Sequence, residues 1–207
     1  MSVPMTNFPL VPTAWATIGP FFPQTFFRDG DNDLTRLEPG APQTAQGRPM
    51  WLTGRVLQEG GGPCVNAVLE AWQADAGGRF RHPRDPAWRD ADAGFLGWGR
   101  AWTDAEGRFA FRTIIPGAYT DATGPRAPHI NLTIIGSGIM ARLATTVFLP
   151  GFAEANAADP VLAALPAPLR PLLVAREDGE GEDAAPRFAL DLLLRGDPAE
   201  ETPFFVD

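Results

Sequence analysis

Short alternating runs between turn residues constrain the fold of this chain more than any other feature. Residues 108–112 (Arg-Phe-Ala-Phe-Arg) alternate polar and apolar side chains directly after the turn sequence Asp104–Gly107. Period-two alternation is typical of a half-buried strand, and the Pro-Gly pair that follows marks a turn. Two more β-rich runs occur at 129–135 and 143–149. This block alone therefore predicts three strands.

The turn residues extend the same pattern to the rest of the chain. The 207 residues include 22 glycines and 22 prolines without a fixed period, which favours many turns over disorder. Further strands are predicted at 51–58, 65–73 and 187–195, and short helical turns interrupted by prolines at 153–173. We expect an all-β protein: an antiparallel β-sandwich with long loops, short helical turns and an extended N-terminal arm.

The first fifty residues differ from the remainder. Prolines break this segment repeatedly, yet it is rich in apolar and aromatic side chains, with four phenylalanines between 21 and 27. An apolar arm that cannot form a continuous helix must lie on its own domain or on a partner. We therefore expect residues 1–50 to be an arm and connection, and residues 51–207 to be the β-sandwich domain.

Charge and cysteine content exclude several classes of partner. The net charge is −8 and the chain contains no lysine, so nucleic acid and anionic membranes are poor candidates. The arginines suit bidentate contacts with carboxylates. Cys64 is the single cysteine, which favours a reducing compartment, and no apolar run approaches the ~18 residues of a membrane span. We expect a cytoplasmic protein.

The candidate metal ligands are few. Besides carboxylates, the sequence offers one tyrosine (Tyr119), two histidines (His82 and His129) and Cys64. His129 and Asn131 would project from the same face of a strand, but an amide is a weak iron ligand beside imidazole or phenolate. A packed, hydrogen-bonded His129 is therefore favoured over a ligating one. The block has the form of a metal or substrate site, and equally of a site that has lost its metal.

Several short motifs occur in a set order over nearly the whole chain. They are Thr17–Phe21 (TIGPF), Glu70–Gly77 (EAWQADAG), Phe95–Arg100 (FLGWGR), Asp104–Tyr119, Ala127–Asn131 (APHIN), Asp159–Leu162 (DPVL) and the closing Phe204-Phe205. In this order they resemble the intradiol ring-cleaving dioxygenases, and within that family the iron-free α subunits of its two-chain enzymes.

The resemblance implies that iron belongs to another chain. The catalytic β chains of such enzymes hold a non-haem Fe(III) with two tyrosines and two histidines. Tyr119 matches one of these tyrosines and His129 the first histidine, whereas Asn131 replaces the second histidine and Ala87 falls where the other tyrosine would be. Arg126 matches the arginine that faces the substrate. The resemblance therefore implies that this chain contains no metal site and no catalytic residue, and that Fe(III) is bound by a partner β subunit.

The resemblance also implies a role for the arm. By position, Thr17, Gly19, Pro20 and Phe21 would reach the partner's active site and bind substrate. Glycine permits close backbone approach to a ligand, and threonine can donate a hydrogen bond to a carboxylate. Phe21 departs from the family's tyrosine, and Ser137 stands where α chains often carry arginine. The resemblance implies that both positions lie near the substrate.

The function that this resemblance implies is ring cleavage by a complex. The partner's Fe(III) and O2 would open 3,4-dihydroxybenzoate to 3-carboxy-cis,cis-muconate, while this chain shapes the pocket and builds a higher oligomer of αβ units. Two alternatives remain: a stand-alone β-sandwich binding or scaffold module, and a self-sufficient dioxygenase with altered ligands.

Overall fold

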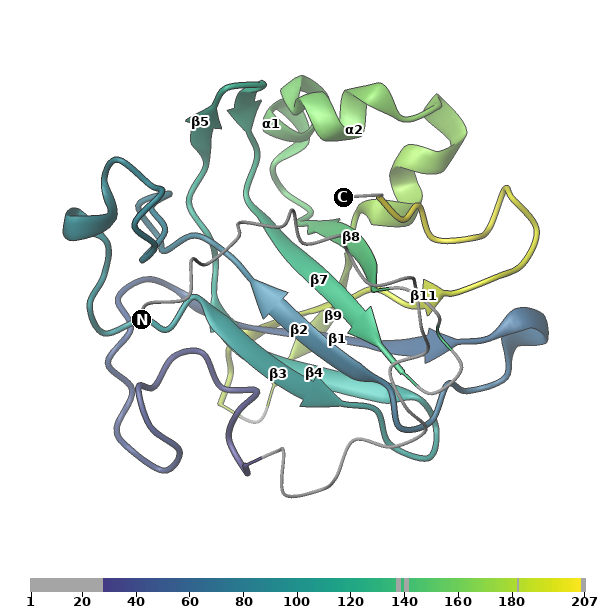
Figure 1. Cartoon of the computed structure of the whole chain (residues 1–207), viewed down its shortest axis with the longest axis horizontal. Helices are drawn as coiled ribbons and strands as arrows, with labels where there is room; N and C mark the ends of the chain where they lie inside the picture. The colour runs from purple at the N-terminus through teal and green to yellow at the C-terminus, as the bar shows by residue number, and fades with distance from the viewer. Residues whose placement is uncertain (1–27, 137–138, 140–141, 182, 206–207) are drawn as a thin grey trace, which may run out of the picture.

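Two β-sheets packed face to face form the body of the protein (Figure 1). The computed structural model describes residues 28–136, 139, 142–181 and 183–205. The larger hydrophobic cluster combines buried side chains from both sheets, including Leu52 and Phe111 from one and Leu69 and Leu132 from the other. The core therefore lies between the sheets, and the predicted β-sandwich is confirmed.

The first sheet is organised around β1 (Pro49–Leu57). Its antiparallel neighbour β4 (Arg108–Ile114) places Phe109 and Phe111 in the core, as the alternation predicted. The sheet is completed by β9 (Arg176–Glu180), β10 (Pro186–Ala189) and β11 (Leu192–Leu193). β10 and β11 pair with β1 in parallel, which departs from the antiparallel pattern. β10 follows β9 through a short antiparallel hairpin and β11 follows β10 almost at once, but no hairpin joins either strand to β1, which lies far earlier in the chain.

A close backbone approach divides the predicted strand 187–195 into two. The carbonyl oxygen of Leu190 lies 1.9 Å from the point where a Cβ on Gly54 would sit. Only glycine allows this approach. The next residue, Asp191, accepts a hydrogen bond from the Arg55 backbone through its side chain (2.9 Å), so the ladder is interrupted between β10 and β11.

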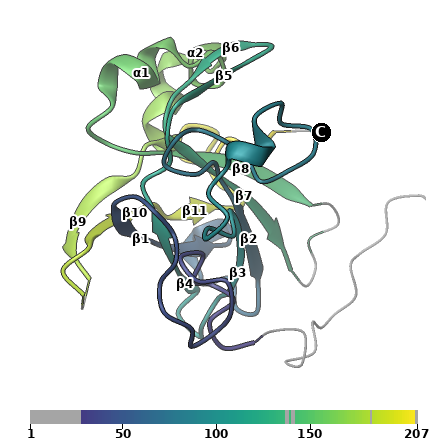
Figure 2. The same ribbon diagram turned by 90° about the vertical axis from the view of Figure 1, so that its left-hand side faces the viewer.

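The second sheet carries the functional region. Its strands lie in the order β3 (Trp98–Trp102), β2 (Val68–Trp72), β7 (His129–Ile135) and β8 (Leu143–Phe148), all antiparallel. A two-stranded hairpin, β5 (Tyr119–Asp121) and β6 (Gly124–Arg126), precedes β7. In Figure 2 the hairpin stands beside the helices at one end of the sandwich.

Short helices fill the connections, as expected from the proline-broken segment. These are α1 (Ala153–Ala158), α2 (Pro160–Ala164) and the 3-10 helix η4 (Ala167–Leu173), with two smaller 3-10 turns, η2 (Glu59–Gly61) and η3 (Trp88–Asp90). Leu162 and Leu173 pack on Phe148 in a second, smaller cluster. Among the described residues, no helix is both long and apolar enough to span a bilayer.

The connection before β1 is part of the folded body. Leu34 is fully buried in the main core, and its backbone N–H donates to the carbonyl of Arg112 at 2.8 Å. Residues 28–48 form no strand, but they pack against the edge of the first sheet at β4.

Candidate functional site

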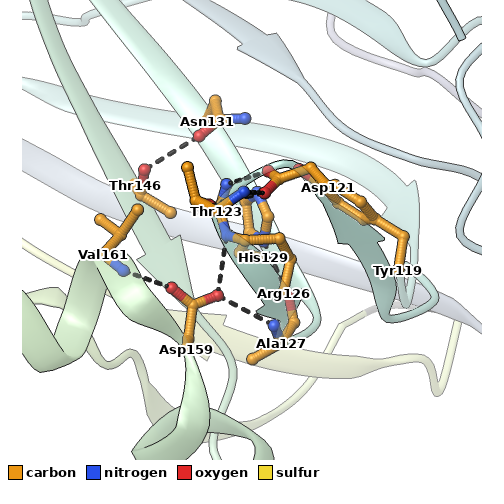
Figure 3. Close-up of polar contacts among 10 residues, drawn as sticks. All are labelled: Tyr119, Asp121, Thr123, Arg126, Ala127, His129, Asn131, Thr146, Asp159 and Val161. Carbon is orange, nitrogen blue, oxygen red and sulfur yellow. Dashed lines mark hydrogen bonds and ion pairs between the residues drawn. The ribbon is translucent and has the colours of Figure 1, made fainter.

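One stretch of chain brings three polar side chains together at the end of the second sheet. Tyr119 on β5 pairs directly with Arg126 on β6, and β7 begins at His129, three residues later. The tight hairpin returns the chain so that Tyr119 and His129 face each other (Figure 3). The resemblance implies that both residues belong to one site, and the structure brings them together.

His129 is buried and fully hydrogen bonded. Its Nδ1 lies 2.7 Å from the carbonyl oxygen of Ala127, which can only accept, so Nδ1 carries the proton. Nε2 then accepts from the Tyr119 hydroxyl at 3.4 Å. Burial lowers the pKa of His129 and raises the pKa of Tyr119, which keeps both groups neutral at pH 7. His129 is therefore the packed, hydrogen-bonded histidine that the sequence favoured.

Asn131 projects from the same strand but is engaged elsewhere. It lies opposite Thr146 in the β7–β8 ladder, and its Oδ1 accepts from the Thr146 hydroxyl at 2.9 Å (Figure 3). This oxygen atom is directed across the sheet rather than left free as a ligand.

Position 87, where the resemblance places a second tyrosine, offers only a methyl group. Ala87 lies in the loop between β2 and β3, immediately before η3. Its backbone N–H donates to Asp85 Oδ1 at 2.8 Å, which shapes the loop but supplies no metal donor.

The residues present do not fit a ferric ion. The two available metal ligands, the Tyr119 hydroxyl and His129 Nε2, are hydrogen bonded to each other. Asn131 and Ala87 occupy the positions of the second histidine and the second tyrosine that the resemblance implies. In the described part of the chain, no three His, Cys, Asp or Glu side chains are grouped so as to hold a metal ion. This donor set is half of the two-tyrosine, two-histidine set that the resemblance implies.

Arg126 is held by two carboxylates. Its Nε lies 3.0 Å from Oδ2 of Asp159, and its Nη1 lies 3.2 Å from Oδ2 of Asp121. Asp159 is fully buried and also accepts from the backbone N–H of Ala127 at 2.9 Å. Burial is the largest single effect and opposes the charge on Arg126, but the hydrogen bonds and charges of Asp159, Tyr119 and Asp121 together outweigh it, and the pKa of Arg126 is raised. The guanidinium is thus fixed in place by the protein itself.

Asp159 is the functional residue whose role the sequence did not reveal. It caps the N-terminus of α2: its Oδ1 accepts from the backbone N–H of Val161 at 2.9 Å, and Pro160 occupies the first helical position. The Asp-Pro pair is a visible helix-start signal. Its pairing with Arg126, 33 residues away, carries no local signal.

The residues expected from the resemblance to bind substrate lie elsewhere in the chain. Thr17, Gly19, Pro20 and Phe21, like Ser137, fall outside the described residues. Among the described residues, three pockets border Tyr119 or Arg126. One of about 630 Å3 is lined by Arg126, Asn131 and Thr146, one of about 590 Å3 includes Tyr119, and one of about 250 Å3 is lined by both Tyr119 and Arg126.

Comparison with known proteins identifies the family. A family model described as Dioxygenase matches residues 18–196. The chain is 38% identical to the protocatechuate 3,4-dioxygenase alpha chain of Burkholderia cepacia over 197 residues, covering 91% of this chain and 94% of that one. The chain belongs to the intradiol dioxygenase family. It is also 40% identical to the protocatechuate 3,4-dioxygenase beta chain of the same organism, covering 80% of this chain and 72% of the relative.

Solved structures agree on the fold of this intradiol dioxygenase family member. The dioxygenase domain of a dioxygenase–carbohydrate-binding fusion from Streptomyces sp. SirexAA-E matches with a TM-score of 0.54 and 25% identity, over 90% of this chain and 99% of that one. The 3-chlorocatechol 1,2-dioxygenase of Rhodococcus opacus 1CP gives a TM-score of 0.54 at 21% identity, over 91% of this chain and 69% of that one, and supports the fold alone. The family uses Fe(III) in general.

Proposed function

We propose that this chain is the non-iron α subunit of a protocatechuate 3,4-dioxygenase. The observation that carries the proposal is the arrangement around His129. The two surviving family ligands bond to each other, and Asn131 bonds to Thr146. A family member that keeps the fold but only half of the iron ligands needs another chain to supply the metal.

Sequence identity alone does not choose between the two chains of such an enzyme. The identities to the alpha and beta chains are 38% and 40%. Coverage of 94% of the alpha relative against 72% of the beta relative favours the α assignment. The residues at positions 87 and 131 favour it independently, because neither alanine nor a hydrogen-bonded amide replaces a tyrosine or a histidine at iron.

The partner in this proposal is a protocatechuate 3,4-dioxygenase β subunit that carries Fe(III). The iron supplies activation of the catechol, and O2 opens the ring of 3,4-dihydroxybenzoate to give 3-carboxy-cis,cis-muconate. This chain contributes the arm, with Thr17, Gly19, Pro20 and Phe21 against the partner's substrate. Its sandwich domain, residues 51–207, builds the higher oligomer of αβ units. The single cysteine, Cys64, suits work in the reducing cytoplasm.

Separate and joint purification tests the proposal. The full chain produced alone should contain no stoichiometric iron and no visible absorbance from tyrosinate-to-iron charge transfer. Co-expressed with a β chain that retains both tyrosines and both histidines, it should co-purify with that chain and cleave 3,4-dihydroxybenzoate. Stoichiometric iron and colour in the isolated chain would overturn the assignment. Failure to associate with any such β chain would instead favour a stand-alone binding or scaffold module.

A further inference from the structure

A hollow of about 440 Å3 lies beside the start of β3, where the connection before β1 runs past it (Figure 1). Its walls come from two stretches of chain, residues 28–39 and residues 96–98. Leu37, Pro39, Leu96 and Trp98 supply the apolar part of the lining. The residues of the network around His129 do not line it, so the hollow is a separate feature.

Most of the exposed apolar side chains gather at this hollow. Five large apolar side chains among the described residues are exposed, and three of them line it: Leu37 (43%), Leu96 (37%) and Trp98 (39%). Apolar residues scattered singly are ordinary on a protein surface, whereas a contiguous group with a polar rim marks a binding surface. The grouping therefore points to an occupant.

The fold holds the hollow in shape. The carbonyl of Leu34, a fully buried residue, accepts from the Leu96 backbone N–H at 3.3 Å. The Arg100 backbone N–H donates to the carbonyl of Asp31 at 2.8 Å. These two bonds fix residues 31–34 against the chain that leads into β3. An occupant therefore meets a preformed surface, and its binding does not have to order the walls.

Charge does not select the occupant. Two arginines and three acidic residues stand around the hollow. Arg36 Nε pairs with Asp33 Oδ2 at 2.7 Å, and the Asp31 carboxylate accepts from the Arg28 backbone N–H at 2.9 Å. Because the rim carries both signs and much of it is already paired, the surface suits an uncharged apolar group.

The chain itself offers such a group at the base of its N-terminal arm. The first described residue, Arg28, lines the hollow, and Phe26 and Phe27 directly precede it in the sequence. Since consecutive Cα atoms are about 3.8 Å apart, both phenylalanines lie within about 8 Å of the Arg28 Cα. A segment tethered so closely has an effective concentration on the order of millimolar, which favours it over any free partner present at lower concentration.

We propose that Phe26 and Phe27 dock in this hollow against Leu37, Leu96 and Trp98 and anchor the arm to its own domain. The anchor sets the reach of the arm: Thr17, nine residues before Phe26, can then lie at most about 32 Å from it. Docking needs neither iron nor a partner chain, so it is independent of the α-subunit assignment.

Limited proteolysis of the full chain by chymotrypsin tests the anchor. The protease must take up the aromatic side chain that precedes the cleaved bond, so a docked phenylalanine is protected. Mass spectrometry gives the cleavage rates after Phe26, Phe27 and Trp15, and a synthetic peptide of residues 12–30 gives the unprotected rates. In the full chain, cleavage after the two phenylalanines should be at least about fivefold slower than in the peptide, and cleavage after Trp15 about equal.

Variants of the hollow localise the docking without altering the cleaved sequence. Leu37→Ser combined with Leu96→Ser should accelerate cleavage after Phe26 and Phe27 at least about fivefold and leave cleavage after Trp15 unchanged. Val65→Ser is the matched control, because Val65 is 43% exposed but lies outside the hollow, and it should change none of the rates. The three substituted side chains are exposed, so far-UV circular dichroism should match that of the wild type.

Three outcomes would overturn the proposal. Peptide-like rates after Phe26 and Phe27 in the wild type would show that the two side chains are not docked. Equal rates in the wild type and the Leu37→Ser/Leu96→Ser variant would place them elsewhere. Protection that disappears on roughly hundredfold dilution would assign the hollow to a second copy of the chain. The iron content of the isolated chain separately tests the α-subunit assignment.

Discussion

The Nε of Arg126 lies 3.0 Å from Oδ2 of Asp159, a carboxylate with no solvent exposure. The same carboxylate accepts from the backbone N–H groups of Ala127 and Val161. One buried side chain thus joins the β5–β6 hairpin, the start of β7 and the N-terminus of α2.

Replacing Asp159 by alanine should lower the free energy of unfolding by about 3–5 kcal/mol, because a largely buried guanidinium loses its buried carboxylate and keeps only Asp121, which is 35% exposed. Urea denaturation measures the change. Asp178→Ala is the control: Asp178 pairs with Arg187, but the two side chains are 42% and 39% exposed, so about 1 kcal/mol or less is expected. Similar decreases in the free energy of unfolding for the two variants would show that the buried ion pair stabilises the protein no more than the exposed one.

Gly78 should tolerate no side chain. Its φ is +76°, and a Cβ there would lie 2.1 Å from the carbonyl oxygen of Ala118, next to Tyr119. Gly78→Ala should therefore destabilise the protein by at least about 3 kcal/mol, from the left-handed backbone and the clash together. Gly60 has a φ of +79° but no atom within 4 Å, so Gly60→Ala should cost only about 1 kcal/mol. Thermal and urea unfolding of the pair would separate the two contributions, and equal costs would rule out the clash.

The buried imidazole of His129 should make the fold sensitive to mild acid. Its pKa is lowered from 6.5 by burial, so the unfolded chain binds more protons than the folded chain as the pH falls below about 6.5. The contribution of His129 to stability is fully present above that pH and is lost as the pH falls towards the folded-state pKa. Urea unfolding at pH 7.5, 6.5 and 5.5 should show this decline, and His129→Gln should flatten it. Parallel pH profiles for the two proteins would show that His129 is not the source.

The iron content of the assembled complex should not depend on Tyr119. Tyr119→Phe removes the phenol but leaves the ring against Phe80, and its 3.4 Å hydrogen bond to His129 contributes at most about 1 kcal/mol. Complexes of the wild-type and variant chains with the β subunit should therefore contain the same iron per αβ unit by metal analysis. Loss of iron would place the metal in this chain and restore the self-sufficient dioxygenase as the better hypothesis.

The arm is tested by a glycine in its motif. Gly19→Val should raise KM for 3,4-dihydroxybenzoate or abolish turnover in the complex while the iron remains, because a residue with a Cβ prevents close approach to a ligand. Steady-state kinetics and metal analysis of the same preparation provide the two readouts. Thr6→Val, in the same arm but outside the motif, should leave both unchanged. Unaltered kinetics of Gly19→Val would show that the arm does not line the pocket.

The sequence by itself determined the features that depend on local pattern and residue type. Alternation in residues 108–112 predicted the strand that buries Phe109 and Phe111, and the proline-broken stretch 153–173 predicted short helices. Against the two-tyrosine, two-histidine set that the resemblance implies, a single tyrosine and asparagine at position 131 predicted an incomplete ferric ligand set. These inferences need no knowledge of which distant residues meet.

Only the tertiary structure decided what the remaining side chains do. The bonds of Asn131 to Thr146 and of Arg126 to Asp159 join residues 15 and 33 positions apart, and the pocket beside Tyr119 forms where the β5–β6 hairpin meets the loop after β2. The strand direction of β10, parallel to β1, likewise had no sequence signal. Such contacts follow from how the whole core packs, and the polarity and spacing of neighbouring residues do not encode them.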